Sequence, residues 1–485
     1  MAHRLTRRGL LATAGGALGA AAFSAGRATA SEPDGGVMTK LSDYMGGAGA
    51  RALPQEAAEK TKQHILDTFA AMVSGCDLPP AQVALKFARA HAGEKVATVV
   101  VSGSLCGPIE AAMVNGMLAH SDETDDSHAP SQSHPGCAVV PAAFAAGEQF
   151  GIDGTRFLRA VALGYDIGPR VGMTLGGLPY QMATHHSTHS ICGTFGAAAA
   201  AGCAADLTAQ QMRWLLDYAA QQAAGVAAWQ RDTDHIEKSL VFAGMPARDG
   251  VSAALLIQIG GTGVEDIFSG ADNFLLTFSP KSDPAGLIDR LGERYEITRT
   301  NIKKWTVGSP VQAPLDALEA MRKKRPFEAA EVQKVVVRVA TSEAKTVNNR
   351  QMPDISLQHL VAVMLLDKTV SFRAAHDKPR MQDAAVLRER AKVELVPDEE
   401  LEKLYPRRET IVEVTLTGGM KLTERVSAVR GTAENPMTRD EVVAKCRDLM
   451  TPVLGAARCS QLIERVLDLE NLKSVRDFRP LLQRA

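Results

Sequence analysis

The densest group of residues able to do chemistry lies between His120 and His134. Within these fifteen residues the sequence has four carboxylates and three imidazoles: Asp122, Glu123, Asp125, Asp126, His120, His128 and His134. Crowded carboxylates change one another's proton affinity, so that one can hold a proton near neutral pH, as acid–base catalysis requires. A solvated acidic loop is the alternative. The flanking stretches 108–120 and 137–150 are apolar, however, and would hold the segment against a core.

A metal site is a second interpretation, since histidine and aspartate at short spacing bind zinc or manganese. The segment contains no HExxH motif and no comparable spaced pair of ligands. The seven cysteines are scattered and form no CxxC pair, whereas an iron–sulfur cluster needs clustered thiolates. We therefore expect no metal ion, and we expect the cysteines to be mainly buried thiols.

Further candidates follow along the chain. The histidines 185, 186 and 189 precede a glycine-rich stretch, 193–196, that is expected to open a helix. Free N–H groups at a helix N-terminus suit an anionic ligand. Lys238 and Lys303, the second in the stretch Ile302-Lys303-Lys304-Trp305, are cationic candidates, and Lys238 taken alone would be solvated. His359 lies in the apolar stretch 355–366, where periodicity alone favours a core or interface histidine.

The elements that must position these residues change in character along the chain. From about residue 40 to 280, apolar residues recur at helical spacing, with Gly or Pro at the breaks. Stretches rich in β-branched residues then predict strands at 332–339, 391–396, 409–416 and 421–428. Helical spacing returns at 439–451. We predict a mainly α fold with an α+β part: a helical domain from residues 40–283 and 431–485, and a smaller α/β lid from 284–430.

The order of these segments resembles that of the MmgE/PrpD family. The matching blocks, spread over about residues 40–475, are 112–116, 120–126, 134–135, 141–143, 193–201, 238–250, 303–317, 356–362 and 435–437. This family includes 2-methylcitrate dehydratase, cis-aconitate decarboxylase and iminodisuccinate epimerase. The resemblance implies a helical domain with a smaller lid, a homodimer, and catalysis without a cofactor or metal.

The resemblance also assigns site residues. Three positions match the family in type: His134, Lys238 and Lys303. Three depart from it, since Glu123 replaces an aspartate, Ser127 a threonine and His359 a tyrosine of the lid. His186 and His189 compete for the histidine before the glycine-rich helix. A lid histidine exchanges protons at neutral pH, where a tyrosine stays protonated.

The implied chemistry is proton transfer at a carbon next to a carboxylate of a small polycarboxylate substrate. The resemblance implies His134 and His359 as the acid–base pair, with Glu123 and Asp126 orienting the histidines. Lys238 and Lys303 would bind carboxylates and stabilise developing negative charge, with Ser127 and one of His186 and His189 also binding substrate. Dehydration, decarboxylation and epimerisation stay open, as do two other classes, a periplasmic carboxylate-binding protein and a metallohydrolase.

The N-terminus predicts export. Arg7 and Arg8 form a twin-arginine pattern, followed by a short apolar stretch to Phe23 and by small residues at 28–30 that suit cleavage. We expect a periplasmic protein with no stable membrane insertion once this leader is removed. The chain has 54 basic and 55 acidic residues, which gives no basic footprint for nucleic acid.

Overall fold

The computed structural model describes residues 36–484. The expected twin-arginine leader and its cleavage site lie outside these residues. Two hydrophobic cores organise the described chain. We call the residues around the first core the helical part (36–302 and 431–484) and those around the second the α/β part (303–430). This architecture, mainly α with a smaller α/β part, confirms the predicted fold class.

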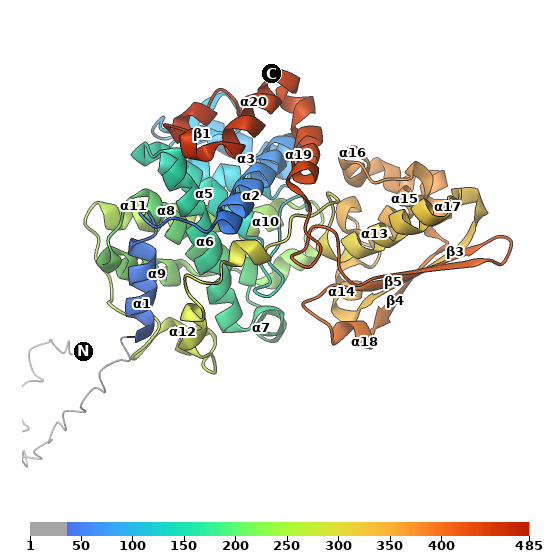
Figure 1. Ribbon diagram of the computed structural model, residues 1–485, viewed down its shortest axis with the longest axis horizontal. Coiled ribbons are helices and arrows are strands. Elements are labelled where there is room, and N and C mark those ends of the chain that lie inside the picture. The colour runs from blue at the N-terminus through green and yellow to red at the C-terminus, as the bar shows by residue number, and fades with distance from the viewer. Residues whose placement is uncertain (1–35, 485) are drawn as a thin grey trace, which may run out of the picture. The chain divides into compact units, whose positions relative to one another are not determined.

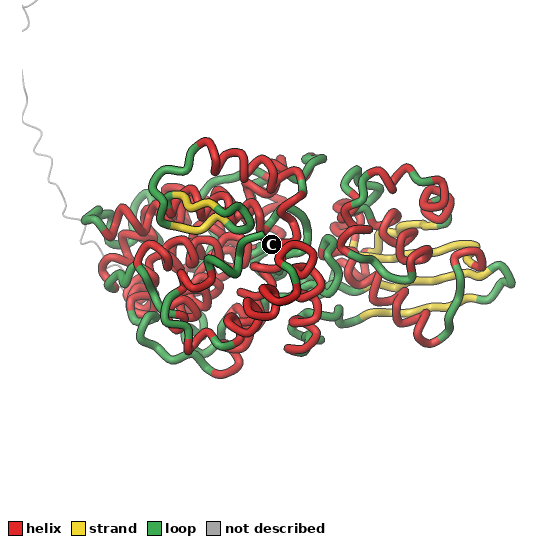
Figure 2. The backbone as a smooth tube through the Cα atoms, turned by 90° about the horizontal axis from the view of Figure 1, so that it is seen from above, coloured by secondary structure: helices red, strands yellow, loops and turns green. Residues whose placement is uncertain are grey.

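Most helices belong to the helical part (Figure 1). They are α1 (Gly36–Gly46), α2 (Gln55–Ser74), α3 (Pro79–Ala90), α4 (Pro108–Ala119), α5 (Pro135–Phe150), α6 (Gly154–Leu175), α7 (Gly177–Thr184), α8 (Thr188–Ala204), α9 (Ala209–Gln222), α10 (Ile236–Ser239), α11 (Met245–Gln258), α12 (Phe274–Phe278), α19 (Arg439–Leu454) and α20 (Ala456–Leu467). A short hairpin of β1 (Ala97–Val99) and β2 (Ser104–Cys106) interrupts them (Figure 2). The C-terminal helices return to the first part of the chain, because α19 and α20 pack beside α2.

Small side chains let the central helices approach closely, as the alanine-rich stretch 197–201 shows. All five of those alanines on α8 are buried. On the facing helix α6, a Cβ atom at Gly168 would lie 2.4 Å from the backbone oxygen of Cys192. Any larger residue at that position would force the helices apart, and interiors packed to crystal-like density do not yield readily.

Helix boundaries fix the ends of the segment 120–134. Pro108 and Pro135 occupy first-turn positions of α4 and α5, where proline removes no hydrogen bond. Gly151 ends α5 in the left-handed region with φ 67°, a conformation that glycine adopts without steric cost. The segment between the helices, which carries the clustered acids and histidines, is therefore held at both ends.

The α/β part is built on a four-stranded sheet in the order β4-β3-β5-β6. Its strands are β3 (Val332–Ala340), β4 (Val393–Asp398), β5 (Thr410–Leu416) and β6 (Lys421–Val426). β3 pairs with β4 in parallel and with β5 in antiparallel orientation. Alternate residues of β5 are buried, so one sheet face meets the core and the other is partly open. The helices of this part are α13 (Ser309–Lys324), α14 (Thr341–Val347), α15 (Leu357–Asp367), α16 (Phe372–His376), α17 (Ala384–Arg390) and α18 (Glu399–Glu402).

The chain passes between the two parts twice, and the two connections touch. The N–H of Ile302 donates to the backbone oxygen of Gly431 at 3.0 Å. Gly431 has φ +98°, and a Cβ atom there would overlap the backbone oxygen of Ile302. Leu287, Tyr295 and Ile297 pack in the helical core. Residues 284–302, which we assigned to the lid from the sequence, therefore pack with the helical part.

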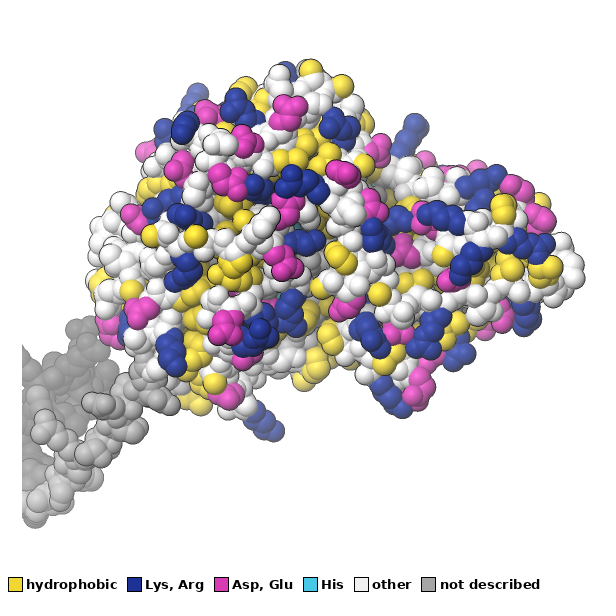
Figure 3. All heavy atoms as spheres, viewed as in Figure 1, with side chains coloured by type: hydrophobic (Ala, Val, Ile, Leu, Met, Phe, Trp, Pro, Cys, Tyr) yellow, Lys and Arg dark blue, Asp and Glu magenta, His cyan; other side chains and the backbone are white. Residues whose placement is uncertain are grey.

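Two further sequence expectations concern buried residues. All seven cysteines lie in the described chain, and all are buried and free, as expected. The run Ile236–Gln258 is long and apolar enough to cross a membrane by length and composition, but 61% of its most apolar window is buried in the protein. Its second half, α11, packs against α4, α5 and α8, which accounts for its apolar residues. On the face drawn in Figure 3, basic and acidic side chains are interspersed.

Candidate active site

The acidic segment between α4 and α5 is buried. Every residue from 120 to 128 has a relative exposure of 9% or less, and so does His134. A loop of this composition is stable inside a protein only if its charges are paired and hydrogen-bonded. The solvated-loop alternative is therefore wrong, and each carboxylate must be explained by its partners.

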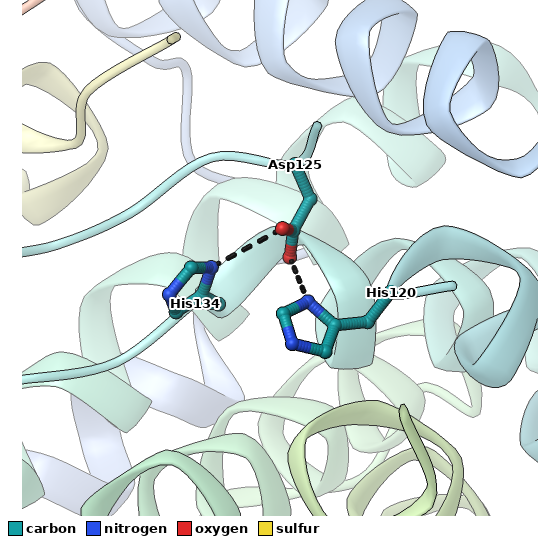
Figure 4. A group of neighbouring side chains, drawn as sticks. All are labelled: His120, Asp125 and His134. Atoms are coloured by element: carbon teal, nitrogen blue, oxygen red, sulfur yellow. Dashed lines mark hydrogen bonds and ion pairs between the residues drawn. The ribbon is translucent and has the colours of Figure 1, made fainter. Parts of the chain in front are cut away.

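Asp125 lies between two imidazoles (Figure 4). Its Oδ1 is 3.2 Å from Nδ1 of His134, and its Oδ2 is 3.0 Å from Nδ1 of His120. Burial alone would raise the pKa of Asp125, but the two imidazoles hold it well below its usual value. Asp125 is thus an ionised acceptor, and it holds each imidazole with the proton on Nδ1. The Nε2 atom of each ring is then free to accept or release a proton.

His134 has a pKa below its usual value because it is buried, although Asp125 opposes that shift. The neutral imidazole therefore predominates near pH 7 and can act as a base. We expected Asp126 to orient the histidines of the site, but its contacts are with Tyr165, Gly136 and His64. It accepts from the Tyr165 hydroxyl at 2.5 Å and from the N–H of Gly136 at 3.0 Å, and lies 2.7 Å from Nδ1 of His64. Asp126 fastens the start of α5, and Asp125 does the orienting.

Glu123 meets both lysines that the sequence singled out. Lys238 forms a buried ion pair with the Glu123 carboxylate. Lys303 donates to the Glu123 backbone oxygen at 2.8 Å and lies 3.6 Å from Oε2 of the same residue. Burial alone would raise the pKa of Glu123, but Lys238 and then Lys303 hold it well below its usual value. Two segments far apart in sequence are thereby tied to the acidic loop.

An aromatic wall stands beside these charges. Phe242, in the π-helical turn Leu240–Gly244 between α10 and α11, stacks on His189 at 3.8 Å between ring centroids and on His120 at 4.7 Å. Single π turns inside helices are frequent at functional sites. Burial, followed by the neighbouring positive charges, lowers the pKa of His189 well below its usual value. Within the described chain, neither ring nitrogen of His189 has a hydrogen-bond partner. A bound ligand could therefore form a hydrogen bond with His189.

The cavity next to this wall has an empty volume of ≈ 550 Å³, including space open to solvent. The helical part lines it with Glu123, Gln132, His134, Leu178, His189, Trp229, Lys238 and Phe242. The α/β part lines it with Ser309, Pro310, Ser342, Glu343, Thr346, Ile355, Tyr405 and Arg408. The cavity therefore lies where the two parts face each other. Its few convergent polar groups beside an aromatic wall are typical of a small-molecule site.

A second buried contact joins the α/β part to the acidic loop. Nε2 of His376, at the end of α16, lies 2.7 Å from Oδ2 of Asp122, and Nδ1 lies 2.6 Å from the backbone oxygen of Phe372. Burial would lower the pKa of His376, but Asp122 and Asp354 raise it to about 9. His376 is thus an imidazolium near neutral pH, and it pairs with the residue that precedes Glu123.

The structure brings together some of the predicted site residues and not others. His134, His189, Lys238 and Glu123 line the cavity. Lys303 and Ser127 lie directly behind it: Lys303 holds the Glu123 backbone, and Ser127 accepts from the hydroxyl of the cavity residue Ser309 at 3.4 Å. His186 is half-buried and bonded to the Tyr180 hydroxyl at 2.7 Å. Of the two competing histidines, the geometry therefore favours His189.

His359 is not among the cavity-lining residues. It is fully buried on α15 among the apolar residues of the α/β core. Burial, with Arg390 and Arg380 nearby, lowers its pKa to about 4. The pairing of His359 with His134 across one cleft has no support in this geometry, and the core-histidine interpretation from periodicity fits it.

The glycine-rich stretch 193–196 does not open a helix, contrary to our expectation. Helix α8 begins at Thr188, which places Gly193 and Gly196 in its interior. Gly193 lies against Pro246 of α11, and Gly196 against Gly164 of α6. These glycines permit close helix packing, and their N–H groups lie within the helix, so the stretch offers no anion site.

Two groups of side chains have the spacing of metal ligands. The donor atoms of His120, Asp125 and His134 lie within 4.8 Å of one another, as do those of His120, Glu123 and His235. The charges argue against an ion, however. Lys303 Nζ lies 3.8 Å from Asp125 Oδ1, and Lys238 is paired with Glu123. A divalent cation would sit within a few ångströms of a lysine in each group, so these donors fit a metal poorly.

Sequence reasoning missed several residues of this site. Asp125 and His120 stood in the acidic segment, but nothing in the spacing separated Asp125 from Asp126. Trp229, Tyr405 and Arg408 carried no motif at all. The sequence placed Arg408 directly before a predicted strand. That position gave no reason to expect Arg408 in the same cavity as His134.

Comparisons with known proteins agree with this geometry. The MmgE/PrpD N-terminal domain model matches residues 39–286, and the MmgE/PrpD C-terminal domain model matches residues 305–469. The chain is 25% identical to a cis-aconitate decarboxylase-like protein of Aspergillus oryzae, over 94% of this chain and 98% of that protein. It is 24% identical to the cis-aconitate decarboxylase of Aspergillus terreus, over 92% and 95%. It is 25% identical to that of Homo sapiens, over 89% and 91%. The chain belongs to the MmgE/PrpD family and is a lyase of that family.

Proposed function

We propose that this lyase acts on a small di- or tricarboxylate, without a cofactor, by proton transfer at a carbon next to a carboxylate. One observation carries the proposal. His134, an imidazole whose Nδ1 faces the buried carboxylate of Asp125, lines the same cavity as the cation Lys238. A fixed neutral base beside a fixed positive charge is what this class of reaction needs.

The roles follow from the contacts. Lys238 would bind a substrate carboxylate and stabilise negative charge that develops on the neighbouring carbon, in a site where water is largely excluded. His134 would remove or deliver a proton through Nε2. In a decarboxylation the bond to the departing carbon dioxide breaks, and its electron pair remains on the substrate carbon framework. His134, after taking up a proton from solvent, delivers that proton to the substrate carbon. In a dehydration His134 removes the proton next to the carboxylate, and the imidazolium so formed gives that proton to the β-hydroxyl, which leaves as water.

The relatives guide the choice of substrate. The relatives from Aspergillus terreus and Homo sapiens are cis-aconitate decarboxylases, so cis-aconitate is the first compound to test. The identity of about a quarter leaves room for another polycarboxylate.

An epimerase of the same fold is the second candidate, and one observation favours it. The rings of His134 and His189 both line the cavity, with centroids 5.2 Å apart. Two imidazoles beside one substrate could divide proton removal and proton return between them.

The test is proton NMR in heavy water with cis-aconitate, citrate, 2-methylcitrate and a racemic dicarboxylate. A decarboxylase consumes the substrate and places deuterium in the product, and a dehydratase consumes the substrate with loss of water. An epimerase exchanges the α-proton without loss of carbon dioxide or water. His134→Gln is the matched control, and it should abolish the signal while the protein stays folded. The proposal fails if the wild-type enzyme neither converts nor exchanges any of these acids.

We also propose that the enzyme is a homodimer, on the strength of the family resemblance. Light scattering after size-exclusion chromatography should give twice the mass of the processed chain. A monomer at micromolar concentration would contradict this.

A further inference from the structure

The α/β wall of the cavity contains one arginine. Arg408 lies between α18 and β5, and its side chain is 16% exposed. Its guanidinium forms an ion pair with Glu343 on α14. Its Nη2 also donates to the Tyr405 hydroxyl at 3.2 Å, and that hydroxyl donates to Oε1 of Gln132 at 2.7 Å. Since Gln132 belongs to the helical part, these bonds hold Arg408 at the junction of the two parts.

Each wall of the cavity carries one basic side chain that is paired with one acid. Among the residues that line the cavity, Lys238 and Arg408 are the lysine and arginine, one on each wall. Each is paired with one acid, Lys238 with Glu123 and Arg408 with Glu343. His134 and His189 lie on the helical wall with Lys238. A ligand with one carboxylate could pair with either Lys238 or Arg408, whereas a ligand with two carboxylates could pair with both.

Arg408 has donors left for such a ligand. A guanidinium carries five N–H donors in a planar fork that matches a carboxylate. In the described chain, the contacts with Glu343 and Tyr405 engage one nitrogen each, Nη1 and Nη2. Burial raises the pKa of Glu343, although Arg408 opposes the shift. An incoming carboxylate can therefore compete with Glu343 for the guanidinium.

We propose that Arg408 binds a second carboxylate of the substrate and so selects polycarboxylates over monocarboxylates. The inference rests on the proposed function, because it assumes that Lys238 and His134 act on the first carboxylate and its neighbouring carbon. The α/β part then supplies specificity, and the helical part supplies the proton transfer.

The neighbouring arginine is a matched control. Arg407 pairs with Glu409 at 2.8 Å and has a half-exposed side chain. It lines a separate groove with Arg299 and Arg408, but it does not line the cavity. Arg407→Gln removes the same charge one residue away, so it tests whether overall charge alone explains an effect.

The first measurement compares kcat/KM for the converted polycarboxylate with kcat/KM for its mono-amide, in which the carboxylate distant from the reacting carbon is neutral. Arg408→Gln should raise KM for the polycarboxylate at least tenfold, the scale of one lost charge-assisted hydrogen bond. It should change kcat/KM for the mono-amide little, so that the preference disappears. Arg408→Lys should be intermediate, because a lysine offers a point charge without the fork. Arg407→Gln should match the wild type.

A second measurement does not need turnover. Calorimetry with propane-1,2,3-tricarboxylate should detect binding to the wild type and at least tenfold weaker binding to Arg408→Gln. The double variant Glu343→Gln/Arg408→Gln removes the unpaired acid that would be left in the single variant. It should fold like the wild type and bind as weakly as Arg408→Gln.

The outcomes separate the two proposals. If the wild type binds the tricarboxylate but converts no acid, the proposed function fails and the binding data still decide the role of Arg408. If the wild type converts a polycarboxylate and Arg408→Gln keeps the wild-type preference and affinity, Arg408 does not bind the substrate. If the wild type neither binds nor converts a polycarboxylate, both proposals are wrong.

Discussion

Nδ1 of His134, which lines the cavity between the helical and α/β parts, lies 3.2 Å from Oδ1 of Asp125. The other oxygen of the same carboxylate faces His120 at 3.0 Å. One buried carboxylate therefore orients two imidazoles, and only His134 of the two lines the cavity. Orientation of a histidine by a carboxylate is a recurring way to prepare a general base.

The first prediction concerns this pair. His134→Gln and Asp125→Asn should each lower kcat by about 10²-fold or more, the usual scale for a general acid or base and its support. In a dehydration or an epimerisation, where His134 starts as the base, kcat/KM falls as pH falls through the pKa of His134, which burial lowers from 6.5. Asp125 raises that pKa, so Asp125→Asn should move the acid limb to lower pH. Steady-state rates measured across pH check both effects.

His186→Gln is the control for this prediction. The family resemblance left His186 and His189 as alternatives for one site histidine. His186 is half-buried, is bonded to Tyr180 and does not line the cavity. Its substitution should leave kcat and the pH profile unchanged. A normal rate in His134→Gln would remove His134 from the reaction.

The second prediction concerns His359. His359→Gln should keep kcat/KM within about threefold of the wild type, because the side chain lies in the α/β core and takes no part in lining the cavity. With a pKa of about 4 it is neutral near pH 7, so its loss removes no charge. Steady-state kinetics beside His134→Gln give the comparison. A fall of 10²-fold in His359→Gln would restore the lid pairing that the sequence suggested.

The elements of this fold could be predicted because they depend on local pattern. The strand at 332–339 alternates and is rich in valine, and the structure has β3 at Val332–Ala340. The stretch 209–228 shows the limit of this approach, because its helical spacing of apolar residues continues past the end of the helix. Helix α9 ends at Gln222, because the chain turns at Gly225, whose φ of +106° a helix does not contain. One glycine among many apolar residues did not mark that end clearly.

The site itself was predictable only in part. The acidic segment stood out by composition, but its burial depends on α4, α5 and the lysines at 238 and 303, which are distant in sequence. Asp125 and Asp126 are adjacent and chemically alike. A loop lacks the regular repeat of a helix or strand, so the sequence does not indicate which way each side chain points. Arg408 and Tyr405 reach the cavity only through the packing of the α/β part, so no spacing along the chain could reveal them.

The third prediction is that activity does not depend on a metal ion. The carboxylates with suitable spacing already have partners: Glu123 is paired with Lys238, and Asp125 accepts from two imidazoles with Lys303 nearby. Dialysis against EDTA should therefore leave kcat unchanged, and adding zinc or manganese should not raise it. Elemental analysis of the active protein provides the independent check. Stoichiometric metal that is lost together with activity would overturn the prediction.

The fourth prediction concerns the leader, which lies outside the described residues. Replacing Arg7 and Arg8 with lysine should leave the protein in the cytoplasm of a bacterium that has twin-arginine export, because the exporter reads the arginine pair. Cell fractionation with immunoblotting measures the periplasmic share. Arg27→Lys, in the same leader but outside the pair, should be exported normally. An unchanged periplasmic fraction in the double variant would refute the export signal.

The last prediction concerns the ion pair between His376 and Asp122. In the folded protein the pKa of His376 is about 9, above its ordinary value of 6.5, because Asp122 and Asp354 outweigh the effect of burial. A raised pKa means that the pair stabilises the fold fully below pH 6.5 and loses this contribution as pH rises through about 9. The free energy of unfolding lost in His376→Gln should therefore be larger at pH 7 than at pH 10, by on the order of 2 kcal/mol. The cost of leaving Asp122 without its partner is common to both conditions, so the difference isolates the titration of His376. Urea unfolding at the two pH values measures it. His91→Gln, at an exposed histidine after α3, should lose the same small amount at both. An equal loss in His376→Gln at pH 7 and pH 10 would show that His376 is not charged in the folded enzyme.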